Sequence, residues 1–97
     1  MFSKKDNNLY TWEEAFNICN SLNSMTISVW RIPNIRESLL LYNYKNENVI
    51  NLNLNQTTYW SSTTYKKDIT KAWSINTKNG EIKAFDKLSK KAVICTF

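Results

Sequence analysis

The stretch from Trp30 to Glu37, which reads Trp-Arg-Ile-Pro-Asn-Ile-Arg-Glu, constrains the fold more than any other part of the chain. It holds the only proline, whose ring fixes its own φ and biases Ile32 towards extended geometry, so a helix cannot run through it. Asn34 follows at the position of an N-cap, and Glu37 lies three residues later, which is the spacing of a capping box. The stretch therefore predicts an extended segment that turns at Pro33 and opens a helix.

A second capping box predicts a helix near the start of the chain. Thr11 would be its N-cap and Glu14 its third helical residue. Apolar residues then recur at the spacing of one helix face as far as Leu22, and they comprise Trp12, Ala15, Phe16, Cys19 and Leu22. This amphipathic pattern places Cys19 towards the core.

The middle of the chain combines one helix with two less regular segments. Met25 to Trp30 is rich in β-forming residues and predicts a short extended run. The helix after Pro33 is expected to span Ile35 to about Tyr44, with an inward stripe made of Ile35, Leu39 and Tyr42, widened by Leu40 or Leu41. Lys45 to Gln56 is dominated by Asn and predicts a long loop, which in a compact domain is often functional.

The last third of the chain predicts antiparallel strands. Thr58–Tyr65 and Ala72–Thr77 are β-branched and aromatic runs, and Asn79-Gly80 is a strong hairpin signal that pairs the second run with Glu81–Phe85. Ala92–Phe97 should form the last strand, with one face made of Val93, Cys95 and Phe97. Two helices followed by a meander define an α+β fold.

Length and charge place the chain in the class of small basic domains. Its 97 residues suffice for one domain, which we assign to residues 11–97 after a flexible or truncated segment at 1–10. The formal charge of +5 favours anionic partners. No apolar run approaches the roughly 18 residues of a membrane span, and the first residues lack the apolar centre of a signal peptide. No nucleic-acid-binding motif accompanies the charge, so specific nucleic-acid recognition is not expected.

The two cysteines, Cys19 and Cys95, lie near opposite ends of the chain. Histidine is absent, and two distant thiols do not make a metal site. Cys95 on an inward strand position could meet Cys19 on an inward helix face, and a disulfide there would contribute roughly 4 kcal/mol. Two buried free thiols are the alternative.

Several of these pieces, in the same order along the chain, resemble the C-terminal domain family of bacterial collagen-like adhesins (the Lcl C-terminal domain), which has a C-type-lectin-like fold. The matching pieces are Thr11-Trp12-Glu13-Glu14-Ala15 with Cys19, Trp30-Arg31-Ile32-Pro33-Asn34 with Glu37, Tyr59-Trp60-Ser61-Ser62-Thr63, Ala72-Trp73, and Cys95. The resemblance implies two helices, a small curved antiparallel sheet, and a disulfide between Cys19 and Cys95. It also implies a secreted or cell-surface setting.

The chain departs from that family at its start. The family has a strand before the first helix, for which only Leu9-Tyr10 could stand in. An incomplete sheet edge would leave backbone groups unpaired and would invite pairing with another chain. Self-assembly into a homo-oligomer, or a partner that supplies the missing strand, is therefore an open alternative.

Catalysis and calcium binding are both disfavoured by the residues. Without histidine, the usual general base and the Ser-His or Cys-His pairs are missing. Calcium needs six to eight oxygen ligands, and the Glu-Pro-Asn and Trp-Asn-Asp motifs of calcium-dependent lectins have no counterpart, since Ser61-Ser62 follows Trp60. We expect no enzyme activity, no metal and no cofactor.

The basic residues gather late in the chain and supply the candidate ligand-binding residues. Two loops of the predicted sheet could converge into one positive surface made of Tyr65, Lys66, Lys67, Lys71, Lys87, Lys90 and Lys91. The family resemblance suggests sulfated glycosaminoglycans or similar polyanions as ligands, and Tyr65 could stack on a sugar ring. The alternative for the lysines is a solvated surface, and the four tryptophans are assigned to the core.

The sequence thus predicts a non-catalytic, calcium-independent recognition or adhesion domain of a bacterial surface, which binds an anionic glycan through a basic face. The alternative function is protein–protein assembly, as in a subunit of a surface fibre, a pilus or a phage tail.

Overall fold

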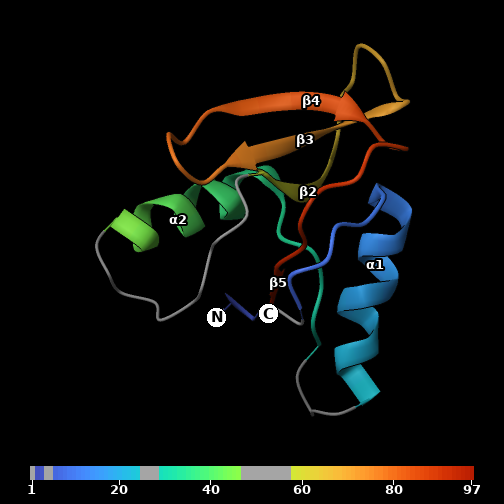
Figure 1. The fold of residues 1–97 in the computed structure, drawn as a ribbon, viewed down its shortest axis with the longest axis vertical. Helices are drawn as coiled ribbons and strands as arrows, with labels where there is room; N and C mark the ends of the chain where they lie inside the picture. The colour runs from blue at the N-terminus through green and yellow to red at the C-terminus, as the bar shows by residue number, and fades with distance from the viewer. Residues whose placement is uncertain (1, 4–5, 25–28, 47–57) are drawn as a thin grey trace.

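The structure of the chain, a computed structural model, describes residues 2–3, 6–24, 29–46 and 58–97 (Figure 1). Two helices precede a three-stranded antiparallel sheet, and a two-stranded sheet joins the ends of the chain. The elements are β1 (Phe2–Ser3), α1 (Trp12–Ser21), the 3-10 helix η1 (Leu22–Ser24), α2 (Ile35–Asn46), β2 (Thr58–Thr64), β3 (Lys71–Asn76), β4 (Ile82–Asp86) and β5 (Cys95–Thr96). This arrangement confirms the predicted α+β class.

Both predicted capping boxes form at the helix starts. The Thr11 hydroxyl accepts the Glu14 N–H (3.3 Å), and the Glu14 carboxylate accepts the Thr11 N–H (2.9 Å). At the proline corner, Asn34 and Glu37 exchange the same pair of bonds, each at 2.9 Å. Glu37 also accepts two bonds of 2.6 Å from the Arg31 guanidinium. The residues before and after Pro33 are therefore bound to one another, which fixes the direction in which α2 leaves the corner.

The predicted inward stripe of α2 is wrong in part. Among residues 35–43 of α2, Ser38 and Leu41 are fully buried, while Leu39 is 38% and Leu40 is 46% exposed. Tyr42 is half-buried, as its place in the stripe required. The direction set by the corner turns Ser38 towards the sheet, although apolar periodicity alone would have turned Leu39 inward.

Two predicted segments fall largely outside the described residues. Of the extended run at Met25–Trp30, residues 25–28 lie outside them, and of the loop at Lys45–Gln56, residues 47–56 do. Residues 45 and 46 belong to α2, which is thus two residues longer than predicted.

The larger sheet has the strand order β2-β3-β4 and contains the predicted hairpin. Its turn spans Thr77 to Gly80, closed by a 2.8 Å bond from the Asn76 N–H to the Glu81 carbonyl. Gly80 has a φ of 76°, a left-handed conformation that glycine adopts without a steric penalty. The Asn79-Gly80 signal therefore located the turn correctly.

Two hydrophobic clusters use alternate residues of the same strands. Trp60 of β2 and Ala72 of β3 pack with residues of α1, whereas Tyr59 and Ile75 pack with Leu41 of α2. Successive strand residues point to opposite faces, so the clusters lie on opposite faces of the sheet. The side chains of residues 92–95 also alternate between the two clusters. Val93 and Cys95 belong to the first cluster, and Ala92 and Ile94 belong to the second.

A disulfide joins Cys19 of α1 to Cys95 of β5, with the two Cα atoms 5.5 Å apart. It confirms the pairing that the family resemblance implied and removes the alternative of two free thiols. Both cysteines are buried in the first cluster, so the bond ties the first helix to the last strand through the core.

The last strand is shorter than predicted. β5 comprises only Cys95–Thr96, which pair with Ser3 and Phe2 of β1, and the chain before it pairs elsewhere, at a parallel bridge between Ala92 and Tyr59 of β2. Phe97, predicted to face inward, is 47% exposed and meets the Trp30 ring edge to face at 4.5 Å.

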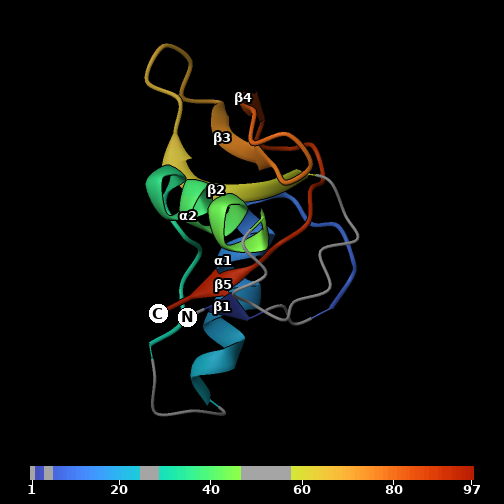
Figure 2. The same ribbon diagram turned by 90° about the vertical axis from the view of Figure 1, so that its left-hand side faces the viewer.

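The segment before α1 pairs with the C-terminal part of the chain at two places. The family's strand before the first helix, for which the sequence indicated only Leu9-Tyr10, is formed by Phe2–Ser3. Tyr10 and Lys91 exchange backbone hydrogen bonds of 2.8 and 2.9 Å. Figure 2 shows β1 beside β5 below the larger sheet, with both ends of the chain there.

Candidate functional site

The candidate site begins at the turn between β2 and β3, which its own hydrogen bonds hold in place. The Tyr65 N–H donates to the Lys71 carbonyl (2.9 Å), and the Asp68 N–H donates to the Tyr65 carbonyl (3.2 Å). The Asp68 carboxylate accepts both the backbone N–H (3.0 Å) and the hydroxyl (2.6 Å) of Thr70. These two bonds hold the pKa of Asp68 below its usual value. The carboxylate is thus engaged inside the turn, and the lysines beside it point to solvent.

A shallow hollow of about 280 Å³, which we call the turn-side hollow, lies against this turn. Its lining consists of Thr63, Thr64, Tyr65, Lys66, Lys67 and Trp73. The Tyr65 and Trp73 rings meet at 90° with their centroids 5.1 Å apart. Lys66 and Lys67 are both exposed at its rim. Three of the predicted ligand-binding residues, Tyr65, Lys66 and Lys67, therefore come together around an aromatic pair.

Two other predicted lysines lie against aromatic rings outside that hollow. The Lys87 ammonium lies 4.0 Å from the centroid of the Trp12 ring, and the Lys91 ammonium lies 3.7 Å from that of Phe85. Burial lowers the pKa of Lys91. Phe85 pairs with Ala72, the neighbour of Trp73, so the Phe85 side chain and the Trp73 side chain occupy opposite faces of the sheet.

The remaining predicted lysines lie near the same end of the sheet. Lys71 begins β3 opposite Asp86 of β4, and the Lys87 N–H donates to the Thr70 carbonyl (2.9 Å), which joins the two loops. Lys90 is exposed, and its charge contributes to the lowered pKa of Glu14. The loops thus meet at one end of the sheet, but their ammonium groups divide between its two faces.

Comparison with known families decides what kind of domain carries this site. The family model described as "Lcl C-terminal domain" matches residues 2–96. The chain belongs to the Lcl C-terminal domain family. The match covers both helices, both sheets and the disulfide, so an Lcl C-terminal domain accounts for the described fold. The family is associated with bacterial surface adhesins, and this chain is accordingly a domain related to cell-surface adhesins. No curated protein matches the chain.

Sequence reasoning missed three lining residues of the turn-side hollow in this Lcl C-terminal domain, namely Thr63, Thr64 and Trp73. Trp73 was assigned to the core, yet it is half-buried and lines the turn-side hollow. Strand alternation could not have indicated this, because Trp73 lies two residues from the buried Ile75 and on the same face of β3.

The carboxylates with perturbed pKa values act as acceptors of local hydrogen bonds. Capping bonds from Thr11 lower the pKa of Glu14, and the Arg31 guanidinium lowers that of Glu37. Within residues 2–3, 6–24, 29–46 and 58–97, Cys, Asp and Glu side chains do not gather in groups of three that could hold a metal ion. The helices of that same part of the chain are too short and too polar to cross a membrane.

Proposed function

We propose that this domain is a non-catalytic, calcium-independent recognition domain of a secreted or surface-attached bacterial protein, and that it binds an anionic glycan at the turn-side hollow. The observation that carries the proposal is the meeting of an aromatic pair, Tyr65 and Trp73, with two exposed ammonium groups, those of Lys66 and Lys67. Apolar rings suit the faces of sugar rings, and ammonium groups suit sulfate or carboxylate substituents.

The neighbouring charges extend this preference. Lys71 and Lys90 add positive charge at the same end of the sheet, and the one carboxylate of the turn, that of Asp68, is already bonded to Thr70. Lys87 and Lys91 are held against Trp12 and Phe85, so they contribute to the positive field more than to direct contacts. A ligand bound mainly through exposed charges must be released by salt, because ions screen such contacts beyond a distance of about 10 Å at 0.1 M.

Retention on immobilised heparin tests the proposal. The unmodified domain should be retained at low ionic strength and eluted by moderate salt. Lys66→Ala/Lys67→Ala should lower heparin affinity by about fivefold, since each exposed charge contact contributes about 0.2–1 kcal/mol. Tyr65→Ala should weaken binding and leave the salt dependence nearly unchanged, because it removes a ring and no charge.

A matched control separates a local site from overall charge. Lys78→Ala/Lys83→Ala removes two exposed positive charges, one from the hairpin turn and one from the face of β4 opposite to that of Trp73. This control should keep most of the heparin affinity. Equal losses in the two double variants would show that binding follows net charge, and the proposed site would then be wrong.

One observation favours the second candidate function, protein–protein assembly. β4 pairs only with β3 among the described strands, so its outer edge lacks a neighbour there, and Ile82 at its start is 39% exposed. A strand of another chain could add to such an edge. Concentration-dependent oligomers in light scattering, together with no heparin retention, would support assembly over glycan binding.

A further inference from the structure

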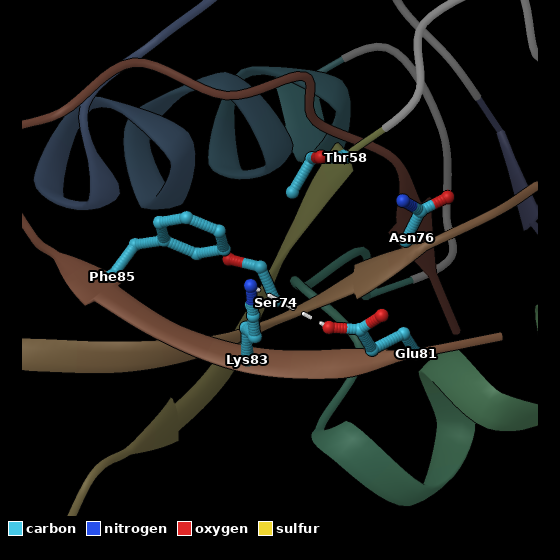
Figure 3. A pocket seen from close by; sticks show the side chains of 6 residues that line it. All are labelled: Thr58, Ser74, Asn76, Glu81, Lys83 and Phe85. Atoms are coloured by element: carbon cyan, nitrogen blue, oxygen red, sulfur yellow. Dashed lines mark ion pairs between the residues drawn. The ribbon is translucent and has the colours of Figure 1, made fainter. Parts of the chain in front are cut away.

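A second hollow lies on one face of the larger sheet, well away from the β2–β3 turn in sequence. It encloses about 180 Å³ and is lined by Thr58, Ser74, Asn76, Glu81, Lys83 and Phe85. We call it the strand-side hollow (Figure 3). The register pairs Thr58 with Asn76 and Ser74 with Lys83, so these side chains project from one face of β2, β3 and β4.

This face is covered over only part of its length. Trp60 and Ala72, which belong to the same face, are packed under α1 and the disulfide. Ser74 lies opposite Trp60 at the margin of that cluster, and Asn76 lies further along β3, where the hollow opens.

The hydroxyl of Ser74 is the feature that calls for a ligand. Ser74 is only 1% exposed, and its Oγ has no hydrogen-bond partner in the described structure. Figure 3 places Ser74 in the middle of the six lining side chains. A buried hydroxyl without a partner costs about 1–3 kcal/mol, and nearly all such groups in proteins are satisfied by protein, water or ligand.

The six lining residues offer both donors and acceptors, and their formal charges balance. Glu81 and Lys83 form an ion pair of 3.6 Å, so their charges balance. The side-chain oxygen Oδ1 of Asn76 accepts the Lys78 N–H (2.9 Å), and the side-chain NH₂ of Asn76 remains a donor for other groups. The Thr58 hydroxyl adds one more donor and acceptor, and the Phe85 ring, which carries the Lys91 ammonium on one face, adds an apolar wall.

We propose that the strand-side hollow is a separate binding site for one uncharged sugar ring. The volume suits a single ring, because pockets for drug-sized ligands measure about 300–1,000 Å³. Hydroxyl groups of the ring satisfy Ser74, Thr58 and Asn76, and its apolar face lies towards Phe85. A neutral ligand is favoured because the Glu81–Lys83 pair leaves no unbalanced charge among the lining residues, and the Lys91 ammonium already lies against the Phe85 ring. The site stands independently of polyanion binding at the turn-side hollow.

Titration of the isotope-labelled chain with the methyl glycosides of glucose, galactose and N-acetylglucosamine tests this site by NMR. At least one glycoside should cause saturable shifts of the Ser74, Asn76 and Lys83 amides, with the Lys66 and Lys67 amides unmoved. Ser74→Ala should weaken that binding by about tenfold while leaving the melting temperature equal or higher, because it removes a buried hydroxyl that no protein group satisfies. Thr58→Val, which keeps the shape of the side chain, should also weaken it.

The control is Lys66→Ala/Lys67→Ala, which should lower heparin affinity by about fivefold and leave glycoside binding unchanged. Failure of heparin binding therefore refutes the function proposed for the turn-side hollow only. Absence of saturable shifts with all three glycosides, or identical shifts in Ser74→Ala, would overturn the strand-side site. So would a crystal soaked with the glycosides in which Ser74 is satisfied by an ordered water alone.

Discussion

Replacing the single glycine with alanine tests how the β3–β4 hairpin is seated against α2. Figure 1 shows the turn of this hairpin next to α2. A Cβ added to Gly80 would lie 2.8 Å from Cε2 and 3.0 Å from Cδ2 of the Tyr42 ring, where carbon atoms normally stay about 3.5–4.0 Å apart. Gly80→Ala therefore carries two separate penalties, one of backbone conformation and one of contact.

The two penalties have comparable sizes. A side chain at a φ of 76° costs about 1 kcal/mol or slightly more. Forcing one extra carbon against a packed ring typically costs about 1–3 kcal/mol, and Tyr42 is half-buried, so its ring can yield in part and the lower end applies. Gly80→Ala should thus reduce the free energy of unfolding by about 2–3 kcal/mol, which lowers the melting temperature by about 10–20 °C in a domain of this size.

A double-mutant cycle with Tyr42→Ala, measured by urea unfolding, separates the two penalties. In the Tyr42→Ala background the contact is gone, so Gly80→Ala should cost only the conformational part, about 1 kcal/mol. Lys78→Ala in the same turn is exposed and should change stability by less than about 0.5 kcal/mol. An equal cost of Gly80→Ala with and without Tyr42 would refute the steric part of the reasoning, and no cost in either background would refute all of it.

Three further variants test the helix starts and the disulfide. Cys19→Ala/Cys95→Ala should lower the free energy of unfolding by about 4 kcal/mol, because it frees a loop with a sequence separation of 76, and an unchanged urea midpoint would contradict this. Thr11→Ala should cost about 1 kcal/mol through loss of the α1 cap, seen as a lower melting temperature. The Arg31 guanidinium lowers the pKa of Glu37 in the folded state. The stabilisation by the Glu37 carboxylate is therefore complete above its unfolded pKa of 4.5 and is lost as the pH falls through the folded pKa. Glu37→Gln should reduce the loss of unfolding free energy that acid causes, measured by urea unfolding at several pH values.

The parts of the fold that depend on local chemistry could be predicted from the sequence. Pro33 with Asn34 and Glu37 defines a corner by steric restriction and by bonds between neighbours, so no tertiary information was needed. The turn at Gly80 follows in the same way from its own backbone conformation. The C-type-lectin-like architecture stays a prediction from the family resemblance.

The parts that depend on distant partners could not be predicted. The rotation of α2 buries Ser38 and exposes Leu39, and that choice depends on how the corner meets the sheet. The pairing of β5 depends on Phe2 and Ser3 of β1, which lie at the other end of the chain. In the site, the sequence shows which lysines belong to each loop. The face of the sheet on which the Lys87 and Lys91 ammonium groups lie depends on the rings of Trp12 and Phe85, which are brought near only by folding.

Two tryptophans cross-link the start of α1 to β2 in a reciprocal manner. The indole N–H of Trp12 donates to the Ser61 carbonyl (2.9 Å), and that of Trp60 donates to the Tyr10 carbonyl (2.8 Å). The disulfide at Cys19 constrains the other half of the helix, so both ends of α1 are held in position against the strands. The indole fluorescence of Trp12 and Trp60 should consequently stay constant when a ligand binds and change only on unfolding, whereas that of Trp73, which lines the turn-side hollow, should respond to the ligand.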